Sequence, residues 1–304
     1  MKSKRYNTFV DKLLTRQTRR CVTFPADTKA ESNRFTQCIR LISLLIENLT
    51  LKNTVTRRDL YYQDVQLFKS QSVVDSLIEL FTQCMNITGE ELGAIAAQKG
   101  LMVGDVTLHC PNGVLTDYRC FGNAMLIPRF GNGTVITLIS EVDYILIVEK
   151  EAVLSQLIKS KEKRLLICGK GYADVLTKTF VNLLSRCLPD VPILGIADFD
   201  PYGFLILENY RSGKGHLDQS CPHLQYTKAS ILHFIKGSSI LNLTLRDFKK
   251  CVKLLHTLDL SNLRARQEVQ RLMVLGKKAE LDVIKDPDGE LVHYIDRMCR
   301  LSLK

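Results

Sequence analysis

YILIVEKEAVLSQLIKSKEKRLLICGKG, residues 144–171, places a helix-like segment between two short apolar runs. YILIV and RLLIC each have the length of a buried strand, and a third such run, VPILGIA at 191–197, ends in DFDPYG. The segment at 172–188, YADVLTKTFVNLLSRCL, has apolar residues at helical spacing. Strands that alternate with helices in this way predict a parallel sheet with right-handed crossovers, and therefore an α/β domain over residues 143–304.

The segments on either side of this region have different predicted secondary structure. RFTQCIRLISLLIENLT, TRRDLYYQDVQLF and SVVDSLIELFTQCMNI each read as a helix, and Thr88 with Glu91 forms a capping-box pattern before LGAIAAQKG. Short β-like runs then follow from 101 to about 140. Helices followed by short strands suit a winged-helix domain over residues 33–142. Residues 230–304 read as a mainly helical, basic extension, and residues 1–32 as a flexible basic arm.

The composition narrows the class of protein. The 304 residues carry a formal net charge of +10, and residues 1–50 alone hold ten Lys or Arg against four acids. This favours a polyanionic partner such as nucleic acid, although a solvated basic surface has the same composition. The ten cysteines form no C-x-x-C pair, which argues against a zinc ribbon and a disulfide-stapled secreted fold, so a reducing compartment is expected. The longest apolar runs are too short to cross a bilayer.

Three carboxylates follow the predicted strands. Glu149 comes directly after YILIV, and Asp198 and Asp200 come after VPILGIA. Because functional groups gather beyond the carboxyl ends of parallel strands, these acids can converge at one edge and bind Mg²⁺. The alternative is a polar DFDP turn with Glu149 stabilising the start of a helix. Glu151 is a competing ligand candidate.

The turn GKG at 169–171 carries Lys170, whose charge suits a phosphate group. The spacing of a Walker A loop is absent, so an ordinary turn between strand and helix explains the same residues.

The two tyrosines of TRRDLYYQDVQLF, residues 56–68, differ in their predicted positions. Thr56 is a plausible N-cap, and Asp59 lies near the positive helix start. On a helical wheel Tyr61 falls in the apolar arc and Tyr62 on the polar face near Arg58. A cation one turn away favours an ionised phenol, which makes Tyr62 a candidate nucleophile; an exposed tyrosine beside solvated charges is the plain alternative. Asp64 falls inside the apolar arc, against the pattern.

Five motifs in order carry a resemblance to a known family: RRDLYYQDVQLF, KGLMVGD, ILIVEKEAVL, ICGKGYADV and ADFDPYG, with a weaker echo in EVQRLMVLGKKAEL. The chain resembles the meiotic DNA double-strand-break transesterases, the eukaryotic relatives of the topoisomerase VI A protein, over about residues 35–210. The resemblance implies a CAP-like winged-helix domain bearing the nucleophile and a Toprim domain binding Mg²⁺. It identifies Tyr62 as the nucleophile, Arg58 as its neighbouring arginine and Glu149, Asp198 and Asp200 as the metal ligands. Lys99, in the KGL motif, is a candidate DNA contact beside Lys170.

The function implied by the resemblance is cleavage of double-stranded DNA through a 5′-phosphotyrosyl link, starting meiotic recombination in the nucleus. The implied partners are a second copy of the chain (a homodimer), other break-formation proteins and a topoisomerase VI B-like subunit. Two rivals remain open: a Toprim nuclease that uses an activated water, and a DNA-binding protein without chemistry.

Overall fold

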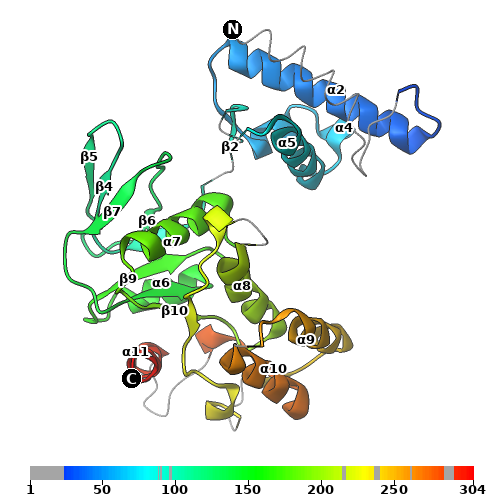
Figure 1. Ribbon diagram of the computed structural model, residues 1–304. Coiled ribbons are helices and arrows are strands. Elements are labelled where there is room, and N and C mark those ends of the chain that lie inside the picture. The colour runs from blue at the N-terminus through cyan, green and yellow to red at the C-terminus, as the bar shows by residue number, and fades with distance from the viewer. Residues whose placement is uncertain are drawn as a thin grey trace. The chain divides into compact units, whose positions relative to one another are not determined.

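The computed structural model describes residues 24–87, 89, 91–95, 98–213, 217–235, 240–260, 262–283 and 291–304. Its contacts divide the chain into two compact units, residues 1–97 and 98–304 (Figure 1). Most of the expected basic arm, residues 1–23, lies outside the described residues, as does Thr88. No described helix is both long and apolar enough to cross a membrane.

The first unit is built from helices around one small core. The helices are α2 (Lys29–Thr50), α3 (Arg57–Tyr62), α4 (Val65–Phe68) and α5 (Gln71–Met85). The core contains Leu41, Leu60, Phe68 and Phe81, all fully buried. The helix predicted from Phe35 is confirmed, and it begins earlier, at Lys29, where Thr28 and Glu31 form a capping box.

Two local predictions for this unit are wrong. Residues 57–69 form two short helices, because Asp64 leaves the helical conformation and caps α4 by accepting a hydrogen bond from the Leu67 amide at 3.1 Å. The helix expected around LGAIAAQKG is also absent from the described residues. Instead, β2 (Ala94–Ile95) pairs in parallel with β1 (Val55–Thr56), and Gly93 adopts a left-handed φ of +70° that interrupts a helix.

The second unit contains the predicted parallel sheet. The three strands β8 (Tyr144–Val148), β9 (Arg164–Cys168) and β10 (Ile193–Ile196) are parallel, as expected, and the sheet order is β11-β10-β8-β9-β3-β6. The edge strands are β11 (Gln225–Tyr226) and β6 (Met125–Leu126), and β3 (Leu101–Val103) lies between β9 and β6. β3 runs antiparallel to β9, so residues 98–142 join this unit, whereas the sequence placed the domain boundary at 142.

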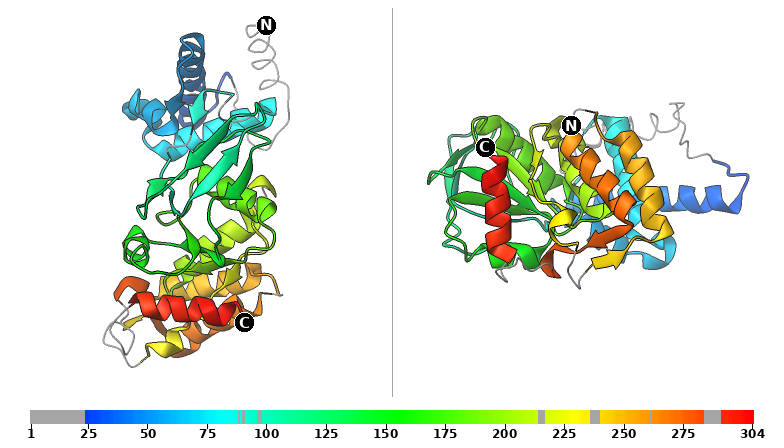
Figure 2. Two further views of the ribbon diagram at one scale, coloured as in Figure 1. Left: turned by 90° about the vertical axis from the view of Figure 1, so that its left-hand side faces the viewer. Right: turned by 90° about the horizontal axis from the view of Figure 1, so that it is seen from below.

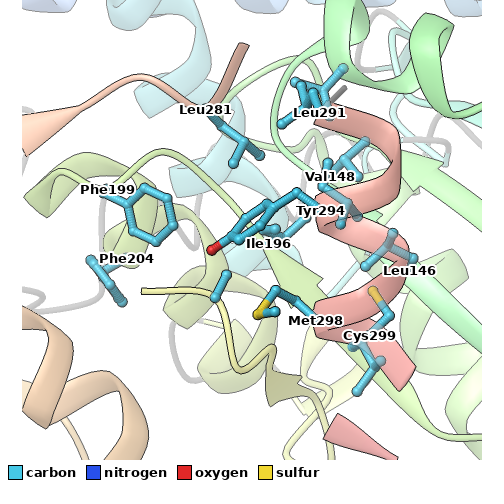
Figure 3. Packing of buried hydrophobic residues seen from close by; sticks show 14 of the residues in the cluster. Leu146, Val148, Ile196, Phe199, Phe204, Leu281, Leu291, Tyr294, Met298 and Cys299 are labelled. Atoms are coloured by element: carbon cyan, nitrogen blue, oxygen red, sulfur yellow. The ribbon is translucent and has the colours of Figure 1, made fainter. Parts of the chain in front are cut away.

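Both faces of the sheet are buried, which explains the continuous apolar strands. Along β8, Tyr144, Leu146 and Val148 face one core, and Ile145 and Ile147 face the other. The first core includes α6 (Glu151–Leu157), α10 (Leu263–Leu275) and α11 (Leu291–Ser302). The second core includes α7 (Val175–Cys187) and α8 (Pro201–Ser212). Figure 3 shows Tyr294 and Met298 of α11 packed near Ile196 of β10.

The remaining elements complete this unit. A three-stranded sheet, order β5-β4-β7, consists of β4 (Val106–His109), β5 (Leu115–Tyr118) and β7 (Val135–Leu138). The helical extension predicted after residue 230 is confirmed by α9 (Leu245–Thr257), α10 and α11, and α9 lies beside α10 (Figures 1 and 2). It also contains an antiparallel pair, β12 (Ile240–Asn242) and β13 (Lys277–Ala279).

Candidate functional site

The tyrosine pair lies at the end of α3, which begins with the predicted cap. Thr56 and Asp59 form a complete capping box, because each side chain accepts a hydrogen bond from the other's backbone amide. Tyr61 is half-buried and packs against the core of the first unit, whereas Tyr62 is 56% exposed. The wheel therefore separated the two correctly.

Arg58 contacts the hydroxyl of Tyr62 one helical turn away. Its Nε and Nη2 lie 3.2 and 3.0 Å from the Tyr62 oxygen and donate to it. This hydrogen bond raises the pKa of Arg58, which stays charged at neutral pH. The contact places a positive charge against the oxygen of an accessible phenol.

The three acids lie at one edge of the second unit, at the carboxyl ends of β8 and β10. Each is oriented by a backbone amide: the Asp198 N–H donates to Glu149 Oε2 (3.2 Å), and the Leu281 N–H donates to Asp198 Oδ1 (2.9 Å). Asp200 is the N-cap of α8 and accepts from the Gly203 N–H at 2.7 Å. The local sequence explains this turn, because Pro201 suits the first helical position.

The electrostatics of this edge reflect concentrated negative charge. Burial raises the pKa of Glu149 to about 7, and the nearby charge of Asp198 contributes to this rise. Burial also raises the pKa values of Asp198 and Asp200. Buried carboxylates whose charges repel one another are stabilised by a cation.

Lys150 supplies one such cation and was not identified from the sequence. Its Nζ lies 3.0 Å from Asp198 Oδ2, 3.1 Å from Glu280 Oε2 and 3.0 Å from Asp282 Oδ1. Burial lowers the pKa of Lys150, but hydrogen bonds with Asp282, Asp198 and Glu280 outweigh it and raise the pKa. The position of Lys150 next to Glu149 in VEKE was the available signal; its partners from 280 and 282 were not predictable.

The acids fit a divalent cation by their chemistry. The donor set is made of oxygens, it is partly buried, and an ammonium group already contacts one of its carboxylates. Within the described parts of the chain, no three His, Cys, Asp or Glu side chains form a ready metal-binding group. The acids thus share an edge without forming a closed ligand set. Glu151, the competing candidate, pairs with Lys170 at 2.9 Å.

Lys99 and Lys170 lie together beside the acids. The Lys99 ammonium donates to the Lys170 carbonyl at 3.3 Å, and the Lys99 backbone amide donates to Asp174 at 2.9 Å. The GKG turn reaches the acidic edge, since the Gly171 amide donates to the Glu149 carbonyl at 2.9 Å. Lys170 itself adopts a left-handed φ of +51°. Two candidate DNA contacts thus share one edge with the candidate metal ligands.

Comparison with known proteins gives two family matches. Residues 144–296 match the model of the Toprim domain shared by Spo11 and the A component of topoisomerase 6, and residues 33–93 match the model described as "Type IIB DNA topoisomerase".

Individual relatives agree with these matches. The chain is 30% identical to meiotic recombination protein rec12 of Schizosaccharomyces pombe over 258 residues, which cover 82% of this chain and 72% of the relative. It is 26% identical to human meiotic recombination protein SPO11 over 204 residues, covering 66% and 51%. It is 32% identical to the A component of DNA topoisomerase 6 of Arabidopsis thaliana over 203 residues, covering 64% and 46%. The chain therefore spans about half the length of two of these relatives.

Proposed function

The chain belongs to the Spo11 and topoisomerase VI A family of topoisomerase-related DNA transesterases, and from that premise we propose that it cleaves double-stranded DNA with Tyr62 as nucleophile. The proposal includes the start of meiotic recombination as its biological role and the nucleus as its place of action. The observation that carries it is the contact of Arg58 with the hydroxyl of the exposed Tyr62. A winged-helix arrangement of the N-terminal unit is part of the same proposal.

The chemistry assigned to the first unit is a transesterification. The Tyr62 oxygen attacks a backbone phosphorus, the new bond joins the tyrosine to the 5′ phosphate, and the bond to the 3′ oxygen breaks. The phenol loses its proton and the departing 3′ oxygen gains one. Arg58 would hold the Tyr62 oxygen in place through its two donors and neutralise charge on the attacked phosphate.

The chemistry assigned to the second unit is metal binding by the Toprim domain. Glu149, Asp198 and Asp200 would hold Mg²⁺, each oriented by the backbone amide that binds one of its oxygens. When bound, Mg²⁺ stabilises negative charge on phosphate oxygens and on the leaving group. Lys99 and Lys170 would contact the DNA backbone, so this part of the affinity would fall with salt.

The proposed assembly is a homodimer that acts with further break-formation proteins and a topoisomerase VI B-like subunit. Each DNA strand needs one tyrosine and one metal site, so two copies suffice for a double-strand break. The net charge of +10 suits a duplex DNA partner.

The test identifies the residue that becomes linked to DNA. Protein is recovered with its DNA under denaturing conditions and digested with protease, and the nucleotide-bearing peptide is sequenced by mass spectrometry. We expect the adduct on Tyr62; Tyr62→Phe should abolish it, and the matched variant Tyr61→Phe should retain it.

Other outcomes would replace the proposal. An adduct on Tyr61 would move the nucleophile by one residue. Cleavage by Tyr62→Phe with no attached protein would identify a metal-dependent nuclease. Full biological function of Tyr62→Phe and of Asp198→Asn would leave only DNA binding.

A further inference from the structure

Lys150 binds three carboxylates at the edge that carries the acids. It follows Glu149 directly, precedes the first residue of α6, and its side chain is 28% exposed. Its ammonium lies within 3.1 Å of oxygens of Asp198, Glu280 and Asp282. A lysine at a helix start is not stabilised by the helix dipole, which favours negative charge there. The three acids therefore account for its position.

Lys150 contacts the Asp198 oxygen that the Leu281 backbone amide leaves free. Asp198 Oδ1 accepts from the Leu281 backbone amide at 2.9 Å, and Asp198 Oδ2 lies 3.0 Å from the Lys150 ammonium. A backbone amide is fixed by its strand or turn, whereas a lysine side chain has several rotatable bonds. A divalent cation thus reaches Asp198 most directly when the ammonium moves away from Oδ2.

The segment 277–283 provides a place for the displaced ammonium. It is fixed against the DFD turn, because Phe199 and Ala279 exchange two backbone hydrogen bonds of 2.9 and 3.1 Å. Lys278 further anchors it to Asp247 at 2.8 Å, and Leu281 is buried in the core (Figure 3). Glu280 and Asp282 lie on this fixed segment and already contact Lys150, so the ammonium keeps two partners after leaving Asp198.

We propose that Lys150 is a positioning residue that acts as an internal counter-ion for the metal site. It neutralises Asp198 in the metal-free protein and shifts onto Glu280 and Asp282 when a divalent cation binds. This rests on the proposed function in one respect, the assignment of Asp198 as a metal ligand. The lysine makes the metal-free edge stable at the cost of a weaker affinity for the metal.

The experiment measures metal binding and not DNA cleavage. Mn²⁺ affinity is determined by titration calorimetry for the wild type, Lys150→Met, Lys150→Arg and Lys163→Met. Lys163 is the matched control, since it pairs with Glu141 on the surface and precedes β9 at the opposite end of the strands.

Loss of the Lys150 charge should tighten Mn²⁺ binding by roughly tenfold, because a positive charge near the cation is removed. Lys150→Arg and Lys163→Met should bind Mn²⁺ like the wild type. Thermal unfolding gives an independent readout: without metal, Lys150→Met should have a lower Tm than the wild type, and Mn²⁺ should raise its Tm by more.

Equal or weaker Mn²⁺ binding by Lys150→Met would overturn the counter-ion role. If Lys150→Met does not fold, the Glu280→Gln/Asp282→Asn double variant decides. Without these anchors the ammonium stays on Asp198, so Mn²⁺ affinity should fall several-fold, and an unchanged affinity would overturn the proposal. If Asp198→Asn binds Mn²⁺ with the same affinity as the wild type, the metal site of the proposed function is refuted instead.

Discussion

Asp296 of α11 pairs with Arg164 of β9 inside the second unit, and its removal should be strongly destabilising. The side chains are only 7% and 2% exposed, and their contact is supported by the hydrogen bond that Ser160 donates to Asp296 at 2.8 Å. Arg164 also donates to the Tyr144 hydroxyl at 2.9 Å. Asp296→Ala leaves a buried guanidinium without its carboxylate, which costs about 3–5 kcal/mol of the free energy of unfolding.

The loss of free energy of unfolding in Asp296→Ala is measured by urea unfolding, followed by far-UV circular dichroism. Hydrogen exchange of peptides from β8 and β9 shows whether the second unit is the part that is destabilised. Asp190→Ala, at an exposed position, should change the free energy of unfolding by less than about 0.5 kcal/mol. The double variant Arg164→Met/Asp296→Leu removes both charges and should be more stable than Asp296→Ala by about 1 kcal/mol or more. If the double variant is as unstable as Asp296→Ala, the unpaired buried charge is not the cause.

Three further predictions follow from other positions. Leu60→Ala opens a cavity under α3 and should cost about 2–5 kcal/mol in unfolding experiments, whereas Val65→Ala, on the surface, should cost less than about 0.5 kcal/mol. In Gly203→Ala the new Cβ would lie 2.4 Å from the Asp198 carbonyl oxygen, so we expect a loss of about 1–3 kcal/mol and weaker Mn²⁺ binding by calorimetry. Burial lowers the pKa of His233 below its ordinary 6.5, so the unfolded chain takes up a proton first as the pH falls. The wild type should lose stability from about pH 6.5 downward, and His233→Asn should lose less in thermal unfolding between pH 7 and 5.

The parts of the fold that the sequence predicted correctly depend on local patterns. The β8, β9 and β10 strands are almost entirely apolar, with Arg164 at the start of β9 as the charged exception, because neighbouring residues such as Leu146 and Ile147 enter different cores on the two faces of one sheet. The start of α3 was equally predictable, since a capping box needs only Thr56 and Asp59.

The predictions that failed depended on contacts between distant residues. Asp64 did not fit the apolar face of the helical wheel because it is the N-cap of α4. Its Oδ2 also lies 3.5 Å from Nε of Arg40 in α2. The strand at Ala94 replaces a predicted helix because Val55, far earlier in the chain, offers it a partner. In the same way, β3 joins the second unit through β9.

The same distinction separates the predicted acids from the residues that organise them. The positions of Glu149 and Asp198 after strand ends were predictable, because strand ends are visible in the sequence. The groups that contact the Asp198 carboxylate, the Leu281 amide and the Lys150 ammonium, were not predicted. The GKKAEL motif, which resembles the family only weakly in sequence, contains Ala279 and Glu280 and ends at Leu281. Its Ala279 pairs with Phe199, and its Leu281 orients Asp198. Residues 279–282 therefore form part of the acidic edge, which explains in physical terms why this C-terminal motif and the DFD turn occur in the same chain.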